Sequence, residues 1–376
     1  MKLRVPKYYK EFKCIADKCK NSCCSAGWEI DIDDKTAEIY KNVGGAFGDK
    51  LKENIEFNKT SHFVLNKNGT CPFFNECGLC DIYINLGEDK LCQICTDHPR
   101  FYEWFDGVKE AGIGLCCEEA ARIILSQNRK FGTYEINIAD EECDEYDEDV
   151  YEYLLNCRNK VINYLDDDTI DLEKRLKNVL WYGYMTQVDL DSGLLDDEEI
   201  VSVDENGEGN CIADIIDFLC GLEPNDNQWI PYLKHCLSVY EKADDKMVEF
   251  ENEHPEVSCY IKNIAIYFVW RYFLKGVYDC DVVCKLKLMY VSCFVIRWLM
   301  YWYWLENETV KLCDCVEIVR RFSEEIEYSN ENLERFWDGC YELDLFSVEN
   351  LIDLIWWGVC FWLLIKSVSK LLNNWV

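Results

Sequence analysis

Apolar residues recur at helical spacing over most of the chain beyond residue 140. This pattern predicts long helices, because apolar positions three and four residues apart form one face of an α-helix. No proline falls between Pro99 and Pro224, so none interrupts the helices expected there. We expect helices near 146–165, 172–189, 211–221, 229–245, 257–277, 281–305, 308–327, 330–339 and 347–373, and an acidic, glycine-bearing loop over 196–210.

The first 117 residues show no sustained period. Glycine and asparagine interrupt them repeatedly, so we expect loops with a few short helices near 33–58 and 80–86. A helix is expected over 118–126, where two acidic residues open an apolar, periodic segment. The chain shows no alternation of strands and helices, which argues against a doubly wound sheet and its nucleotide site.

The balance of charge changes near residue 125. The 376 residues include 39 Lys and Arg and 71 Asp and Glu, a formal net charge of −32. Residues 1–125 hold 17 basic and 20 acidic residues, whereas 126–376 hold 22 and 51. We therefore predict a mainly α protein with a loop-rich cysteine and iron–sulfur domain over 1–125, followed by an all-α acidic helical domain over 126–376.

The acidity and the apolar runs limit the possible partners. A strongly negative surface repels phosphate backbones, so we expect no nucleic acid partner and instead a basic, lysine-bearing protein. The apolar run 354–365 is too short for a membrane helix, and the run 288–304 carries Arg297 in its middle. We therefore expect buried helices and no membrane span.

Cysteine is the strongest compositional signal, with 24 in the chain and 11 of them in the first 117 residues. The N-terminus has no apolar stretch typical of a secretory signal, so a secreted disulfide framework is not expected. We expect instead a metal or iron–sulfur protein in a reducing cytoplasm. The other 13 cysteines are interpreted as core residues of the helices.

The early cysteines come in short clusters of the kind that bind metal. Their spacing is Cys14-x4-Cys19-x3-Cys23-Cys24, Cys71-x5-Cys77-x2-Cys80, Cys92-x2-Cys95 and Cys116-Cys117. Thiolates suit zinc and iron–sulfur clusters, and the spacing alone does not separate these two. Because neighbouring side chains diverge, Cys23 and Cys24 indicate either two sites or one cysteine without a role. Cys117 precedes the 118–126 helix, whose dipole is expected to lower its pKa.

The order of these residues carries a resemblance. Cys23-Cys24-Ser-Ala-Gly-Trp28, Cys71-Pro-Phe-Phe, Leu91-Cys92-x-x-Cys95-x-x-His98-Pro-Arg100-Phe and Cys117-x-Glu119-Ala-Ala-Arg122 follow one another in the chain. Over residues 14–122 the chain resembles the flagellin lysine N-methylase (FliB) family, part of a wider group of zinc- or iron-chelating cysteine proteins. The resemblance implies methyl transfer from S-adenosylmethionine to lysine ε-amines of flagellin, and a 4Fe–4S cluster.

The resemblance also implies which cysteines bind the cluster. Cys77 and Cys116 fall where the family has no cysteine, and His98 stands where the family often has tyrosine. None of these departures disturbs the rest of the pattern. The implied ligands are Cys14, Cys19, Cys23, Cys24, Cys71, Cys80, Cys92, Cys95 and Cys117.

Methyl transfer to lysine needs further groups. The amine has a free pKa of about 10.4 and must lose its proton, so a base is required, and Glu110 and Glu119 are the carboxylates nearest the recognised motif. The donor's sulfonium suits an aromatic face, for which Trp28 is the candidate. Its carboxylate suits a guanidinium, for which Arg271 is favoured over Arg100.

Two alternatives stay open. Arg271 and Arg297 both interrupt apolar helices, and each either binds the donor or neutralises a buried acid. The main alternative to the enzyme is a non-enzymatic module that chelates zinc or an iron–sulfur cluster and binds a partner protein.

Overall fold

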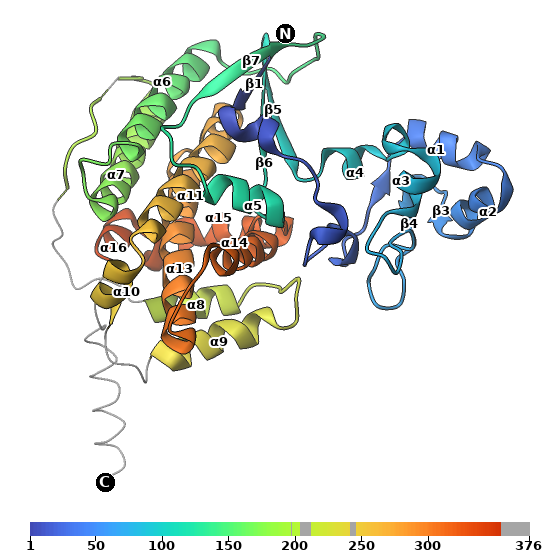
Figure 1. The fold of residues 1–376 in the computed structure, drawn as a ribbon. Helices are drawn as coiled ribbons and strands as arrows, with labels where there is room; N and C mark the ends of the chain where they lie inside the picture. The colour runs from blue at the N-terminus through green and yellow to red at the C-terminus, as the bar shows by residue number, and fades with distance from the viewer. Residues whose placement is uncertain (197, 204–211, 241–245, 355–376) are drawn as a thin grey trace.

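The computed structural model describes residues 1–196, 198–203, 212–240 and 246–354 (Figure 1). The strands are β1 Lys2–Pro6, β2 Asp31–Ile32, β3 Ile55–Glu56, β4 Ser61–Phe63, β5 Arg100–Phe105, β6 Val108–Ile113 and β7 Thr133–Asn137. The first eight α-helices are α1 Asp34–Asn42, α2 Gly45–Glu53, α3 Asp81–Leu86, α4 Gln93–Asp97, α5 Glu118–Leu125, α6 Glu148–Leu165, α7 Leu172–Ser192 and α8 Ile212–Cys220. The others are α9 Trp229–Tyr240, α10 Met247–Glu253, α11 Glu256–Tyr272, α12 Gly276–Asp279, α13 Val283–Asn307, α14 Leu312–Ile326, α15 Asn330–Glu342 and α16 Val348–Ile352.

The predicted mainly α fold is confirmed. Apart from the segment 347–373, each helix expected from the periodicity is present in the described residues, with its ends shifted by a few positions. Of the segment 347–373, only Val348–Ile352 forms a helix in the described residues, and this helix ends at Asp353. Side-chain caps explain several of the starts: Asp147, Asp171 and Ser329 each accept a backbone N–H from the first turn of α6, α7 and α15. Positions 197, 204–211, 241–245 and 355–373, which include parts of four predicted segments, lie outside the described residues.

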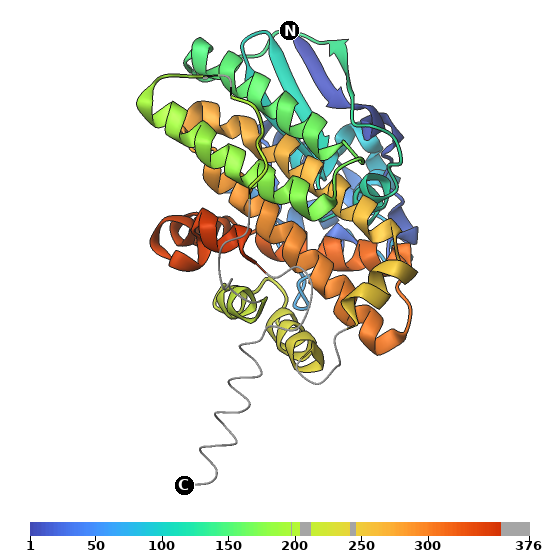
Figure 2. The ribbon, with the colours of Figure 1, turned by 90° about the vertical axis from the view of Figure 1, so that its left-hand side faces the viewer.

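The longest helix, α13, forms the centre of the molecule. It is apolar on all sides, and nearly all of its residues are buried. A helix of that composition is stable only when other helices surround it. Helices α7, α9, α11 and α14 pack against it, and Figure 2 shows it running alongside α7 and α11.

Two small sheets were not predicted from the sequence. One has the strand order β5-β6-β1-β7, with β1 parallel to β6 and antiparallel to β7; the other has the order β2-β4-β3. Strands of two to six residues are too short to show an alternating pattern. Strand β1 also finds its partners more than 100 residues away, which no local pattern reveals.

The molecule has two separate hydrophobic cores. One lies in a cysteine-rich lobe, residues 24–98, which contains α1–α4 and projects to one side in Figure 1. The other fills the body, residues 1–12 and 99–354, and combines the larger sheet, α5 and the later helices. A junction loop, residues 13–23, connects them.

The two cores separate near residues 23 and 98. Strand β7 lies in the predicted acidic helical part and pairs with β1 at the N-terminus, so that part is not purely helical. The domain boundary near residue 125 stays a prediction. Within the described residues, no helix combines the length and the apolar character that crossing a bilayer requires.

Stability should depend on pH through Glu325, a buried residue of α14. Its carboxylate accepts the backbone N–H groups of Asn225 at 2.7 Å and Asp226 at 2.8 Å. Burial raises the pKa of Glu325 to about 7, against the effect of these hydrogen bonds. Because the folded pKa exceeds the unfolded one, this group favours folding most at low pH, and its contribution is lost as pH rises through 7.

We therefore expect Glu325→Gln to flatten part of the fall in melting temperature between about pH 5 and pH 8. Thermal melts across that range measure the effect. Glu331→Gln is the matched control, because it removes one exposed carboxylate from α15. An equal change of slope in both variants would show that net charge, and not burial of Glu325, sets the dependence.

Candidate functional site

Five of the nine predicted cysteine ligands gather in the core of the lobe. Cys71 and Cys92 are buried there, and three others pack against the same core. The backbone N–H of Cys71 donates to the carbonyl of Cys24 at 2.8 Å, which joins two distant segments. Burial, together with the charges of neighbouring thiols, raises the pKa of Cys71 to about 12. These five form the lobe group: Cys24, Cys71, Cys80, Cys92 and Cys95.

The other four cysteines lie where the junction loop meets α5. Cys117 is the N-cap residue of α5, and Glu118 is the first residue of the helix. The Glu118 Oε2 atom accepts the backbone N–H of Lys20 at 2.7 Å and lies 3.5 Å from Cys19 Sγ, so it holds the loop against the helix. Cys117 interacts electrostatically with each of the other three. These four form the junction group: Cys14, Cys19, Cys23 and Cys117.

Adjacent Cys23 and Cys24 connect the two groups. The hydrogen bond between their sulfurs raises the pKa of Cys23 and lowers that of Cys24 to about 7. A hydrogen bond between Cys92 and Cys95 likewise lowers the pKa of Cys92 and raises that of Cys95. Each pair therefore contains one thiol whose pKa is lowered, which favours the thiolate, the form of cysteine that binds metal.

The prediction that the pKa of Cys117 is lowered was wrong. Burial raises it, although the backbone N–H groups of Ala120 and Glu119 at the start of α5 act in the lowering direction. Desolvation of the charged thiolate outweighs the helix dipole, because the junction loop covers the beginning of the helix. The sequence shows that a helix begins here, but not that another segment covers its start.

The two cysteines excluded from the ligand set have different surroundings from the other nine. Cys77 is exposed, at the tip of a lobe loop. Cys116 is buried in the body, where burial raises its pKa and its sulfur hydrogen-bonds to the Tyr328 hydroxyl. Neither packs in the lobe core. Their exclusion stays a prediction.

The donor chemistry of both groups fits an iron–sulfur cluster or zinc. All nine cysteines are free thiols, and thiolates are the ligands that both centres prefer. In the described part of the chain, however, no three His, Cys, Asp or Glu side chains are placed to hold a single metal ion. The structure places the nine predicted ligands in the lobe group and the junction group. Metal binding itself stays a prediction.

An aromatic cluster connects the lobe to the body beside these cysteines. The Trp28 ring stacks on Tyr328 with centroids 5.8 Å apart and planes 10° apart, and His98 contacts both rings. Burial lowers the pKa of His98 to about 4, so its ring is neutral at pH 7. The Tyr328 ring approaches so closely that a side chain at Gly114 would collide with its hydroxyl.

The guanidinium of Arg271, on α11, lies on the body side of the Tyr328 ring, 4.9 Å from its centroid. It pairs with buried Glu327 at 3.3 Å. The carboxylate of Glu327 also accepts the hydroxyls of Tyr267 at 2.9 Å, Tyr272 at 3.0 Å and Ser323 at 2.6 Å. Arg271 therefore has an acidic partner within the protein.

The structure brings both Trp28 and Arg271 into contact with Tyr328, but it does not bring Arg100 to them. Arg100 packs on Phe12 and Tyr9 at the start of β5. Its neighbour Phe101 contacts Arg271 instead. Successive residues of a strand point to opposite faces, which explains the separation.

The two predicted bases lie in different surroundings. Glu110, on β6, is buried and pairs with Arg158 of α6, whose Nη2 lies 2.7 Å from Oε1. Glu119 pairs with Arg122 at 2.6 Å, close to the Cys117 thiol. Of the two, only Glu119 lies beside the cysteines. Arg297 pairs with Glu251 of α10, which is the structural partner that one alternative predicted.

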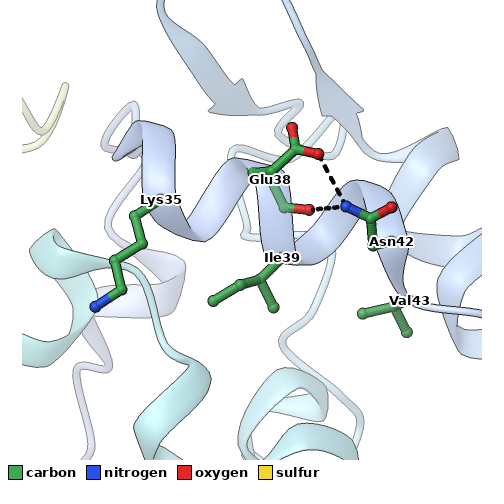
Figure 3. A pocket seen from close by; sticks show the side chains of 5 residues that line it. All are labelled: Lys35, Glu38, Ile39, Asn42 and Val43. Carbon is green, nitrogen blue, oxygen red and sulfur yellow. Dashed lines mark hydrogen bonds between the residues drawn. The ribbon is translucent and has the colours of Figure 1, made fainter.

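A surface hollow on the lobe contains none of these residues. It lies along one side of α1 (Figure 3) and is lined by Lys35, Glu38, Ile39, Asn42 and Val43. The Asn42 amide donates to the carbonyl of Glu38 at 2.8 Å and to its carboxylate at 2.9 Å. Because Asn42 and Glu38 hydrogen-bond to each other, these two side chains have fewer polar atoms free to bind a ligand in the hollow.

Sequence reasoning missed Tyr328 and Glu327. Tyr328 is one of 23 tyrosines, and Glu327 is one of 71 acidic residues. No motif surrounds either one. The available signal was the buried arginine at 271, which requires a buried acid somewhere in the chain.

Comparison with known proteins identifies the family. A family model described as the FliB lysine N-methylase C-terminal domain matches residues 135–354, more than half of the chain. The flagellar biosynthetic protein FliU of Salmonella muenchen is 27% identical over 128 residues, which are 32% of this chain and 75% of that protein.

The proteins named Lysine-N-methylase of Salmonella choleraesuis and Salmonella typhimurium are 27% and 26% identical over 128 and 133 residues. These matches span about a third of each relative's length, 32% in both cases, and 32% of this chain. No solved structure matches the chain. On the match of its helical body, the protein belongs to the FliB lysine N-methylase family.

Proposed function

We propose that this protein transfers methyl groups from S-adenosylmethionine to lysine ε-amines of flagellin, and that its N-terminal cysteines hold a 4Fe–4S cluster. The observation that carries the proposal is the family match over residues 135–354. The similarity to proteins named Lysine-N-methylase and FliU supports the reaction and the flagellar substrate. The gathered cysteines of the lobe and junction groups support the cluster.

Glu119 is the favoured base. A lysine amine must be neutral to attack the methyl group, so a carboxylate at the site has to accept its proton. Glu110 is held by Arg158 inside the body and would have to leave a buried ion pair to act. Glu119 is bound by the more exposed Arg122, and it lies next to Cys117 at the junction.

The aromatic cluster is the favoured place for the methyl donor. The face of a tryptophan or tyrosine attracts a sulfonium cation, and Trp28 is only half-buried. The Trp28 indole N–H is buried and has no hydrogen-bond partner among the described residues. The donor's carboxylate would have to compete with Glu327 for Arg271.

Methyl transfer is tested with anaerobically purified protein, labelled S-adenosylmethionine and flagellin. Label on lysine side chains is the expected result, and flagellin whose lysines have been blocked by reductive methylation is the control. Iron and sulfide analysis of the same preparation reports the cluster. Absence of label with an intact cluster would contradict the enzyme and favour the metal-binding module that interacts with a partner protein.

The rate of methyl transfer should fall as salt rises. The part of the chain beyond residue 125 contains 51 acidic and 22 basic residues, and it attracts a lysine-bearing substrate. At physiological salt the Debye length is about 8 Å, so this attraction is largely screened. The apparent second-order rate constant, measured from low to physiological salt, tests the prediction. A constant value would mean that the acidic surface does not act in substrate encounter.

A further inference from the structure

Two cysteines of the helical body, outside the predicted ligand set, lie in contact through their sulfurs. Cys284 is in the first turn of α13, and Cys340 is in the last turn of α15. The Cys340 thiol hydrogen-bonds to the Cys284 sulfur. We propose that these two residues are a modification site, at which a peroxide closes a reversible disulfide that links α15 to α13. The inference depends neither on metal binding nor on methyl transfer.

The packing of the two helices brings these residues together independently of that hydrogen bond. The buried ammonium of Lys287, one turn after Cys284, donates to the backbone carbonyl of Cys340 at 2.9 Å. Residues three apart on a helix share a face, so Cys284 lies on the face of α13 that meets the end of α15. Gly339 packs so closely on Phe218 that a Cβ atom there would lie 3.1 Å from the ring. Both contacts fix the end of α15.

The pair lies just under the surface of the body. Cys284 is fully buried, and Cys340 is 5% exposed. The Tyr341 hydroxyl hydrogen-bonds to the Cys284 sulfur, although Tyr341 itself is 68% exposed. A molecule of the size of hydrogen peroxide therefore reaches the pair once this exposed ring moves, whereas a bulky disulfide reagent would have to part the helices.

The surroundings of the pair make it slow to react. Burial and the hydrogen bond to Cys284 raise the pKa of Cys340, and the Asp281 carboxylate acts in the same direction. The Lys287 ammonium acts in the lowering direction but does not prevail. Because the thiolate is the form that attacks an oxidant, the pair reacts more slowly than an exposed cysteine. It therefore stays reduced under mild oxidation and closes when the oxidant persists.

Other cysteines of the body bond to oxygen instead of sulfur. The Cys259 thiol donates to the carbonyl of Gln127 at 3.5 Å, and the Cys293 thiol donates to the carbonyl of Ile261 at 3.8 Å. A carbonyl oxygen cannot complete a disulfide, whereas a second thiol can. The hydrogen-bonded pair is thus the place in the body to which the proposal applies.

The reaction consumes one peroxide for each disulfide. One sulfur attacks a peroxide oxygen, which forms a sulfenic acid and releases one molecule of water. The second sulfur then attacks the sulfenic sulfur, and the sulfenic oxygen leaves with the second thiol proton as another molecule of water. The two thiols lose two electrons and two protons, and hydrogen peroxide is reduced to two molecules of water. A small thiol reductant reverses the change by thiol–disulfide exchange.

The disulfide would join two helices that are distant in the sequence. Helix α13 forms the centre of the body, and α15 begins just after Tyr328 of the aromatic cluster. A disulfide restricts the unfolded chain over the segment 284–340, which stabilises the folded state relative to the unfolded one. The oxidised protein should therefore melt at a temperature higher by a few degrees.

The test uses the full chain, purified anaerobically in reduced form and then exposed to increasing doses of hydrogen peroxide. Free thiols are alkylated in denaturant, and the protein is digested without reductant by trypsin and then by glutamyl endopeptidase. The peptides 276–285 and 336–342 should be recovered joined, lighter than their sum by two hydrogen atoms. Dithiothreitol should separate them. Loss of the exposed Cys77 thiol shows that the dose of oxidant is sufficient.

The peptide 276–285 also contains the exposed Cys280, which provides the matched control. Cys280→Ser should keep the disulfide, whereas Cys284→Ser and Cys340→Ser should each abolish it together with the rise in melting temperature. Recovery of Cys284 and Cys340 as free thiols from wild-type protein, at a dose that consumes Cys77, would overturn the proposal. This measurement does not depend on how the variants fold. A disulfide made by Cys280 in place of Cys284 would also overturn it.

Discussion

Replacing Arg271 by methionine is expected to lower the stability of the protein by about 3–5 kcal/mol. Methionine keeps much of the bulk but removes the charge that neutralises Glu327, whose side chain is fully buried. Three hydroxyl groups still donate to that carboxylate, yet they do not carry a positive charge. Thermal and denaturant unfolding of the variant measure the loss.

The second variant, Arg271→Met with Glu327→Gln, separates the roles of the arginine. It removes both charges, so much of the lost stability should return. If Arg271 instead binds the methyl donor, the single change would leave unfolding nearly unaltered. It would then weaken S-adenosylmethionine binding by about 1.5–3 kcal/mol, the value of a charged hydrogen bond, in calorimetric titration.

Replacing Cys92 and Cys95 together by serine is expected to abolish metal binding in the lobe and to unfold much of it. The lobe core is small and contains Cys71 and Cys92 among its buried residues, so metal ligation would supply a large part of its stability. Limited proteolysis should cut residues 24–98 in the variant while the helical body resists.

Cys77→Ser provides the matched control, since it changes an exposed cysteine of the same lobe. It should retain both metal and protease resistance. Equal iron loss in the two proteins would contradict the ranking of ligands. If the variant with both Cys92 and Cys95 replaced keeps its metal but its lobe is cut by protease, these two cysteines stabilise the lobe by packing alone.

Helices were predicted well because their signal is local. The periodicity around α6, α7 and α13 repeats within each helix, so ten or twenty residues suffice to reveal it. The largely apolar α13 was correctly expected to be buried. The strands β1 and β7 were missed because they are short and pair across the whole N-terminal part of the chain.

The candidate site divides in the same way. The order and spacing of the cysteines were enough to indicate the family and nine ligand candidates. The spacing did not show that Cys23 interacts with Cys117, or that the backbone N–H of Cys71 donates to the carbonyl of Cys24, because both contacts depend on how the loop over residues 13–23 is attached. Arg100 and Arg271 were both candidates for the donor's carboxylate, yet Arg100 packs on Phe12, whereas Arg271 of α11 packs on Phe101 of β5.

The sequence by itself thus determined the helices, the acidic character and the family pattern, since each is written in neighbouring residues. Only the tertiary structure decided which distant side chains meet. Trp28 stacks on Tyr328 across 300 positions, and Arg271 receives its charge partner from a residue that no motif marks. Such contacts arise because the packing of the body and the lobe determines where each segment lies in space. That packing is a property of the whole chain, and no short stretch of residues contains it.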